Sequence, residues 1–176
     1  YGPLPQKITP SIRIEDGCIN FADKAKWQII YFTFENGEKS YTVKTDLILP
    51  SEIEKPPVFL NIGFNEEIPN KYLPLEEIID NGFGVFYIYY EGVSKDNGDF
   101  ESDLASLFSN GGKDYGKISL WTYMAICAMD YLMTRDDIDK KNVAVIGHSR
   151  LGKTALLTAA LDERFALCCT NESGCC

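Results

Sequence analysis

The 176-residue sequence contains little histidine, little positive charge and no long apolar run. Its 17 Lys and Arg residues against 26 Asp and Glu residues give a formal net charge of −9. Nucleic-acid and anionic-membrane surfaces draw most of their affinity from positive charge, so neither partner is expected. No apolar run approaches the ~20 residues that a membrane-spanning helix needs. The single histidine, His148, limits any Ser-His, Cys-His or multi-histidine metal site built within this chain to one imidazole.

The six cysteines lack the pattern of a disulfide framework or a zinc site. There is no C-x-x-C pair, which zinc clusters usually contain. Cys168 and Cys169 are adjacent, as are Cys175 and Cys176, and neighbours in a strand point to opposite faces. We therefore expect buried free thiols, which mildly favours reducing surroundings, and no metal or other cofactor.

Composition and patterning predict one α/β domain. Hydrophobic residues make up 45% of the chain and charged residues 24%, which excludes a disordered or collagen-like chain. We expect residues 1–25 to form an N-terminal arm and residues 26–176 to form the domain. The predicted strands cover residues 27–34, 41–49, 58–62, 85–90, 142–146 and 166–170, and the predicted helices cover residues 73–80, 118–133 and 150–161.

The order of these elements predicts the type of sheet. Asn36-Gly37 between the first two strands is a hairpin signal, so the sheet begins antiparallel. Strands and helices then alternate, which predicts a three-layer α/β sheet that is mostly parallel after its first strands. Ligands of such sheets bind at the carboxyl ends of the strands. The polar segment 91–116 is long enough to carry part of a site.

The segment that carries chemistry is VAVIGHSRLGKT, from Val143 to Thr154, where a buried strand turns at a glycine into a helix. From Gly147 to Thr154 it matches the phosphate loop G-x-x-x-x-G-K-[ST]. In that interpretation backbone N–H groups cradle phosphates, Lys153 reaches the terminal phosphates and Thr154 holds Mg²⁺. A nucleotide-binding protein is therefore one hypothesis.

The same segment also fits a nucleophile elbow, a sharp turn that raises Ser149 above the sheet and points the next backbone N–H at a forming oxyanion. Leu151 stands where the pattern G-x-S-x-G has its last glycine, and Gly152 follows one position later. The structural alternative is that Ser149 only caps the following helix.

Position in the chain favours the elbow. A phosphate loop normally follows the first strand of its sheet, whereas four or five predicted strands precede Gly147. No run of four apolar residues ending in Asp follows Thr154 to supply a second Mg²⁺ ligand. An elbow after the fifth strand, with a hairpin at the start, is the order of the α/β-hydrolase fold.

The residues GHSRLGKTALL (147–157), DERFA (162–166) and NESG (171–174) resemble the glucuronoyl esterase family of α/β-hydrolases. Members of that family cleave the ester between lignin alcohols and the 4-O-methyl-glucuronic acid branches of xylan. The resemblance is close over residues 82–176 and looser over residues 26–81. It implies a serine esterase that forms an acyl-enzyme and needs no metal. The alternatives are another carbohydrate esterase, such as an acetyl-xylan or feruloyl esterase, and a non-catalytic binding remnant.

The resemblance also implies roles for four residues. Ser149 would be the nucleophile, and Arg150 would help the oxyanion hole through its backbone N–H and its guanidinium. Lys153 would hydrogen-bond hydroxyls of the uronate ring, and Glu172 matches the position where one branch of the family carries its triad acid. If these two residues have no catalytic role, Arg150 would only pair with an acidic surface residue, and Glu172 would be a solvated carboxylate at a strand end.

The general base is the residue that this set lacks. His148 precedes Ser149, so we expect its side chain to point away from the Ser149 side of the turn. In the family the catalytic histidine lies well beyond the sixth strand. We therefore expect the N-terminal half of a larger hydrolase, truncated after about its sixth strand and inefficient in turnover by itself. Its last strand, 166–170, would be an exposed edge that pairs into a homo-oligomer. The family's insoluble substrate implies secretion, which the cysteine usage opposes.

Overall fold

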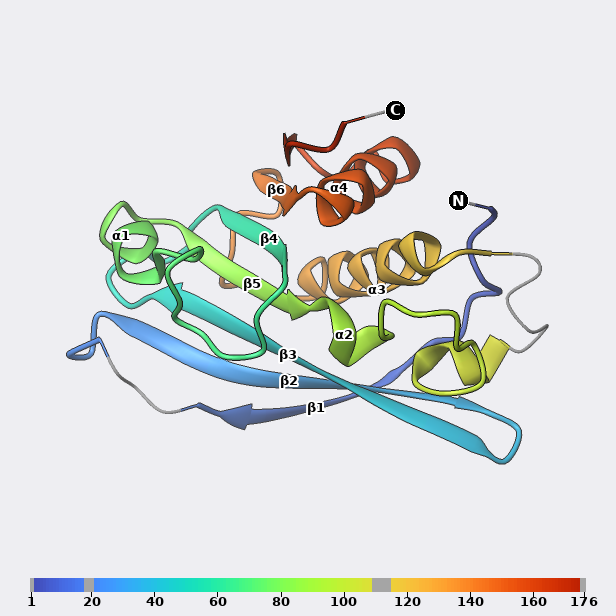
Figure 1. Cartoon of the computed structure of the whole chain (residues 1–176). Coiled ribbons are helices and arrows are strands. Elements are labelled where there is room, and N and C mark those ends of the chain that lie inside the picture. The colour runs from blue at the N-terminus through green and yellow to red at the C-terminus, as the bar shows by residue number, and fades with distance from the viewer. Residues whose placement is uncertain (1, 18–20, 109–114, 175–176) are drawn as a thin grey trace.

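A computed structural model describes residues 2–17, 21–108 and 115–174, which form one seven-stranded sheet with helices on both faces (Figure 1). In chain order the elements are β1 (Ser11–Asp16), β2 (Ala25–Asn36), β3 (Lys39–Pro50), β4 (Val58–Gly63), α1 (Leu75–Asp80), β5 (Gly84–Tyr89), α2 (Tyr90–Val93), the 3₁₀ helix η1 (Leu104–Phe108), α3 (Lys117–Leu132), β6 (Val143–His148), α4 (Arg150–Leu161) and β7 (Leu167–Asn171).

The strand order across the sheet is β1-β2-β3-β5-β4-β6-β7. The pairs from β1 to β5 are antiparallel, and the pairs from β5 through β4 and β6 to β7 are parallel. The predicted hairpin is present between β2 and β3, where Gly37 adopts a φ of +62°. The three-layer α/β prediction is therefore confirmed, including the change from antiparallel to parallel pairing.

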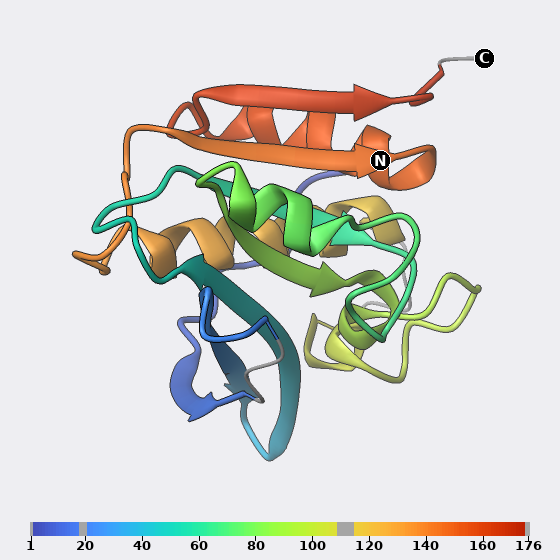
Figure 2. The same cartoon turned by 90° about the vertical axis from the view of Figure 1, so that its left-hand side faces the viewer.

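Helices cover the two faces unequally. Buried residues of α3 and α4 pack on one face, against the buried side chains of β2, β4 and β6. On the other face α1 packs over β3 and β5, with Leu75 and Ile79 against Ile48 and Tyr87. Figure 2 shows α1 in front of the sheet and α3 and α4 behind it. The carboxyl ends of β4, β5 and β6 thus lie together at one edge.

Strand β1 is a difference from the sequence prediction, which placed residues 1–25 in an arm. Residues 11–16 form the edge strand next to β2, so this part of the expected arm belongs to the sheet. All six residues are exposed, and Ile12 and Ile14 retain 39% and 46% of their accessible surface. Ile12 and Ile14 do alternate with polar residues, but two apolar residues after a proline-rich stretch are too short a run to identify a strand. The preceding residues do lie over α3, where the backbone N–H of Ile8 donates to the Tyr123 hydroxyl.

The described cysteines are free. Cys127 is buried in α3, and burial raises the pKa of its thiol to about 12. Cys168 and Cys169 are half-buried in β7, so the expectation of full burial holds only for Cys127. The predictions for Cys18, Cys175 and Cys176 lie outside the described residues. None of the helices formed by the described residues is long and apolar enough to cross a bilayer.

An aromatic cluster joins the sheet to α3. Phe32 of β2 is fully buried, and its ring meets Phe86 of β5 and Tyr131 of α3 edge to face at centroid distances of 6.3 and 5.8 Å. Edge-to-face pairs add to the free energy that apolar burial alone provides. Phe32 therefore ties the antiparallel part of the sheet to the helix layer.

We expect Phe32→Ala to lower the free energy of unfolding by about 3–5 kcal/mol, because the cavity it leaves adds to the lost burial. Urea denaturation followed by circular dichroism measures this change. Tyr72, which is 72% exposed, supplies the control: Tyr72→Ala should stay within about 0.5 kcal/mol of the parent chain. Equal losses in the two variants would contradict this account of the core.

Candidate active site

The turn from β6 into α4 places Ser149 in a backbone conformation that L-residues rarely adopt. Its φ is +56° and its ψ is −121°. A non-glycine residue in this region is strained, and such strain persists only where the surroundings hold it. Ser149 makes no side-chain capping bond to α4, so the capping alternative does not fit. The predicted strand–turn–helix with serine at its apex is present.

Two glycines allow this turn. A Cβ on Gly147 would lie 2.2 Å from the carbonyl oxygen of Leu151, closer than any real contact. A Cβ on Gly152 would lie 3.0 Å from the carbonyl oxygen of Asn171 and 3.0 Å from Cβ of Ser173. The glycine at 152 therefore permits the close approach of α4 to the end of β7. This explains why the chain tolerates Leu151 where the general pattern has glycine.

The phosphate-loop alternative does not fit this geometry. Thr154, which would hold Mg²⁺ in that interpretation, is fully buried. Its hydroxyl donates to the carbonyl oxygen of Arg150 at 3.1 Å, one turn back in α4. A hydroxyl committed to its own helix inside the core is not available to a metal ion at the surface.

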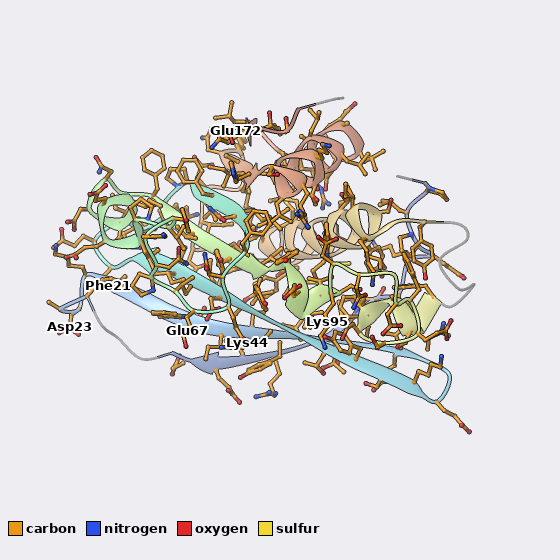
Figure 3. The ribbon with its side chains drawn as sticks, viewed as in Figure 1. Phe21, Asp23, Lys44, Glu67, Lys95 and Glu172 are labelled. Atoms are coloured by element: carbon orange, nitrogen blue, oxygen red, sulfur yellow. The ribbon has the colours of Figure 1, made fainter. Side chains whose placement is uncertain are left out.

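A backbone hydrogen bond brings Glu172 next to the elbow. The N–H of Ser149 donates to the carbonyl oxygen of Asn171, with an N···O distance of 2.8 Å. Glu172 follows directly, at the carboxyl end of β7, with a φ of +48° and a side chain that is 77% exposed. Figure 3 shows Glu172 at the part of the molecule formed by β6, α4 and β7. The predicted nucleophile and acid thus follow adjacent parallel strands.

His148 lies at the end of β6 and faces the acid. Its Nε2 atom is 3.8 Å from a carboxylate oxygen of Glu172. Its ring meets Phe64 edge to face at 6.4 Å. Together with residues that follow β4, it lines a cavity of about 630 Å³ at the carboxyl ends of the strands. Substrate sites in sheets of this kind lie at this end.

Arg150 and Lys153 begin α4. The guanidinium of Arg150 pairs with the carboxylate of Asp96, in the loop after α2. Its backbone N–H belongs to the first turn of the helix, whose N–H groups have no acceptor within the helix. Lys153 is half-buried four residues after Ser149, so the two lie on the same side of the helix start. The electropositive N-terminus of α4 and two cationic residues therefore follow the serine within one helical turn.

Sequence reasoning did not name Asp96. The segment 91–116 was predicted to carry part of a site, and Asp96 lies in it, 54 positions before the arginine that it contacts. The one feature of the sequence that could have indicated a role for Asp96 is its place in the polar loop that follows β5 and α2. The described residues contain no group of three or more His, Cys, Asp or Glu side chains placed to hold a metal ion.

Comparison with known families identifies this arrangement. The family model described as glucuronyl esterase of fungi matches residues 32–176. The chain belongs to the glucuronoyl esterase family. The matched residues include the whole elbow and Glu172, which agrees with the resemblance seen in the sequence.

Two curated proteins are similar over part of the chain. Carbohydrate esterase MZ0003 from an unknown prokaryotic organism is 40% identical over 107 residues, which are 57% of this chain and 25% of that protein. Putative hydrolase YtaP of Bacillus subtilis (strain 168) is 31% identical over 93 residues, which are 53% of this chain and 30% of that protein. The matched part thus spans between a quarter and a third of these curated relatives.

Solved structures agree with the family over nearly the whole chain. A promiscuous CE15 esterase from a marine bacterial metagenome is 28% identical with a TM-score of 0.77, covering 99% of this chain and 54% of that one. A glucuronoyl esterase from Solibacter usitatus is 27% identical with a TM-score of 0.76, covering 94% of this chain and 52% of that one. The chain therefore has the α/β-hydrolase fold of these proteins over about half of their length.

We expect Gly147→Ala to open the elbow, because the added Cβ meets the Leu151 carbonyl. The free energy of unfolding should fall by about 3 kcal/mol, and Ser149 should lose its reactivity toward an organophosphonate. Gly98→Ala is the control, since a Cβ there meets nothing within 4 Å. A Gly147→Ala variant as stable and as reactive as the Gly98→Ala variant would contradict the close approach described here.

Proposed function

We propose that the protein is a serine esterase of the carbohydrate esterase type, acting on esters of glucuronic acid carried by xylan. The observation that carries the proposal is the left-handed backbone of Ser149 at the turn between β6 and α4. Strain of this kind at a strand–helix turn is characteristic of nucleophiles in α/β-hydrolases. Membership of the glucuronoyl esterase family supports the choice of substrate class.

The proposed reaction is acyl transfer through the serine. The Ser149 hydroxyl attacks the carbonyl carbon of the uronate ester, and the carbonyl oxygen takes up negative charge. The Arg150 N–H and guanidinium stabilise that oxygen. The bond to the alcohol then breaks, the alcohol leaves with a proton, and water hydrolyses the acyl-enzyme to free uronate and serine.

Lys153 and Glu172 have supporting roles in this proposal. The Lys153 ammonium offers three donors in the first turn of α4, which suits the hydroxyls of a sugar ring. The Glu172 carboxylate would orient a histidine and stabilise its protonated form during the reaction. Its position after β7, next to Ser149, supports that role.

The proposed reaction also needs a general base to take the proton of Ser149. His148 is the one histidine in the sequence, and its Nε2 atom faces Glu172. We therefore propose that the 176-residue chain reacts at Ser149 but turns over ester slowly. The substrate, an insoluble plant polymer, implies that the protein works outside the cell.

A second proposal concerns assembly. β7 is the last strand of the sheet, and Leu167 at its start is 57% exposed. An open strand edge with exposed apolar side chains is a template for pairing with another chain. We propose that β7 edges of two copies pair into a homo-oligomer, which light scattering tests.

The nucleophile is tested by covalent labelling. A fluorophosphonate should phosphonylate the purified chain once, and peptide mass spectrometry should place the label on Ser149. Ser149→Ala should remove the label, whereas Ser51→Ala, at an exposed serine in the turn after β3, should keep it. Equal labelling of the Ser149→Ala variant would sink the proposal. Stabilisation by a nucleotide with Mg²⁺ would favour the phosphate-loop alternative instead.

The substrate class is tested by protection of Ser149 from that label. Free 4-O-methyl-glucuronate should slow phosphonylation, and acetate should do so far less. Lys153→Met should raise the uronate concentration for half-protection by about tenfold or more, since a charged hydrogen bond contributes ~1.5–3 kcal/mol. Lys140→Met, far from the elbow at the amino end of β6, should not change it. Protection by acetate alone would point to an acetyl esterase.

A further inference from the structure

We propose that Asp96 is a positioning residue, which holds the guanidinium of Arg150 beside the oxyanion site. The inference rests on the proposed function, because it concerns the same serine. The carboxylate of Asp96 pairs directly with the terminal nitrogen of the Arg150 side chain. Arg150 in turn follows the strained serine immediately, so its side chain starts at the elbow itself.

The pair is poorly suited to stabilise the fold. The Arg150 side chain is 52% exposed and the Asp96 side chain 28% exposed. Ion pairs this close to water contribute little to the free energy of unfolding. The pair does fix the direction of the Arg150 side chain, because the Asp96 carboxylate selects one of the many rotamers of this long, flexible side chain.

The backbone before Asp96 is fixed by two groups of α3. Ser94 is fully buried, and its hydroxyl accepts a hydrogen bond from Lys117 Nζ at 2.7 Å. Its carbonyl oxygen accepts a hydrogen bond from Trp121 Nε1 at 2.9 Å. Two residues before Asp96, the chain is thus attached to the N-terminal turns of α3.

The backbone on either side of Asp96 is held by the loop itself. The N–H of Lys95 donates to the Asp103 carboxylate at 3.1 Å, and the N–H of Asn97 donates to the carbonyl oxygen of Lys95 at 2.9 Å. Figure 3 shows Lys95 in this loop, beyond α2. Lys117 Nζ also contacts the carbonyl oxygen of Asp99. Asp96 is therefore presented by a loop pinned on both sides.

The space around the pair explains why an arginine here needs to be held. A cavity of about 290 Å³ lies beside it, lined by Asp96, Arg150, Trp121 and the start of α3. A guanidinium released by Asp96 has room to swing into this space. Arginine donors stabilise an oxyanion only when their position is set before the reaction.

A double-mutant cycle on the phosphonylation rate of Ser149 tests the proposal. In that reaction the bond from Ser149 Oγ to phosphorus forms, the phosphorus–fluorine bond breaks, fluoride leaves and the serine proton passes to solvent. The phosphonyl oxygen takes the place of the ester oxyanion. We expect Asp96→Asn and Arg150→Met each to slow labelling five- to tenfold, and the double variant to be no slower than Arg150→Met alone.

Controls separate positioning from a structural effect. Asp96→Glu should recover most of the rate, and the thermal midpoint should change little in all variants. Glu15→Gln removes an exposed arginine–carboxylate pair, that of Arg13 and Glu15, and should leave the rate unchanged. If Asp96→Asn does not fold, Asp96→Ser replaces it in the cycle.

Three outcomes overturn the proposal. Additive losses show that Asp96 acts independently of Arg150, and an unchanged rate shows that it does not act at all. A faster rate shows that Asp96 holds Arg150 away from the site. In each case the label still lies on Ser149, so the proposed function stands. A label that survives Ser149→Ala overturns both.

Discussion

The site depends on one constraint, the left-handed backbone of Ser149. The strained turn is held by neighbours rather than by the serine's own preferences. Gly147 and Gly152 remove the side chains that would push the turn apart, and the hydrogen bond to Asn171 ties it to β7. A residue in this conformation presents its side chain away from both the strand and the helix. The same turn begins α4, whose first residues include Arg150 and Lys153.

The sheet around this turn supplies rigidity. β6 lies between β4 and β7 with parallel pairing on both edges, so the elbow emerges from a strand whose backbone is hydrogen-bonded on each side. α4 packs back against that strand through Leu151 and Ala155, both fully buried. The loops that complete the site are attached to the same core, as the hydrogen bond from Trp121 to the chain after α2 illustrates. The strained residue therefore lies between a strand and a helix that are both held by the packed core.

Much of the fold was predictable, because its elements follow simple patterns. The aromatic and β-branched run of β2, the Asn-Gly turn and the helical spacing in α3 predicted these elements to within a few residues. β1 was missed because its alternating pattern contains only two apolar residues and follows a proline-rich stretch. The elbow was predictable from local spacing, and its place in the chain favoured it over a phosphate loop. The burial of Thr154 against α3 is a further argument that spacing could not provide. Asp96 was not predictable, because only the fold brings it to Arg150.

The bond between Ser149 and Asn171 has a mechanical consequence. β7 forms one edge of the described sheet, Glu172 follows it directly, and its last residue, Asn171, accepts the hydrogen bond from the Ser149 N–H. A displacement of β7 along or away from β6 would therefore be transmitted to the turn through a single peptide group. A segment or a chain that packs against β7 would therefore also change the position of Ser149, because Asn171 of β7 accepts the hydrogen bond from the Ser149 N–H.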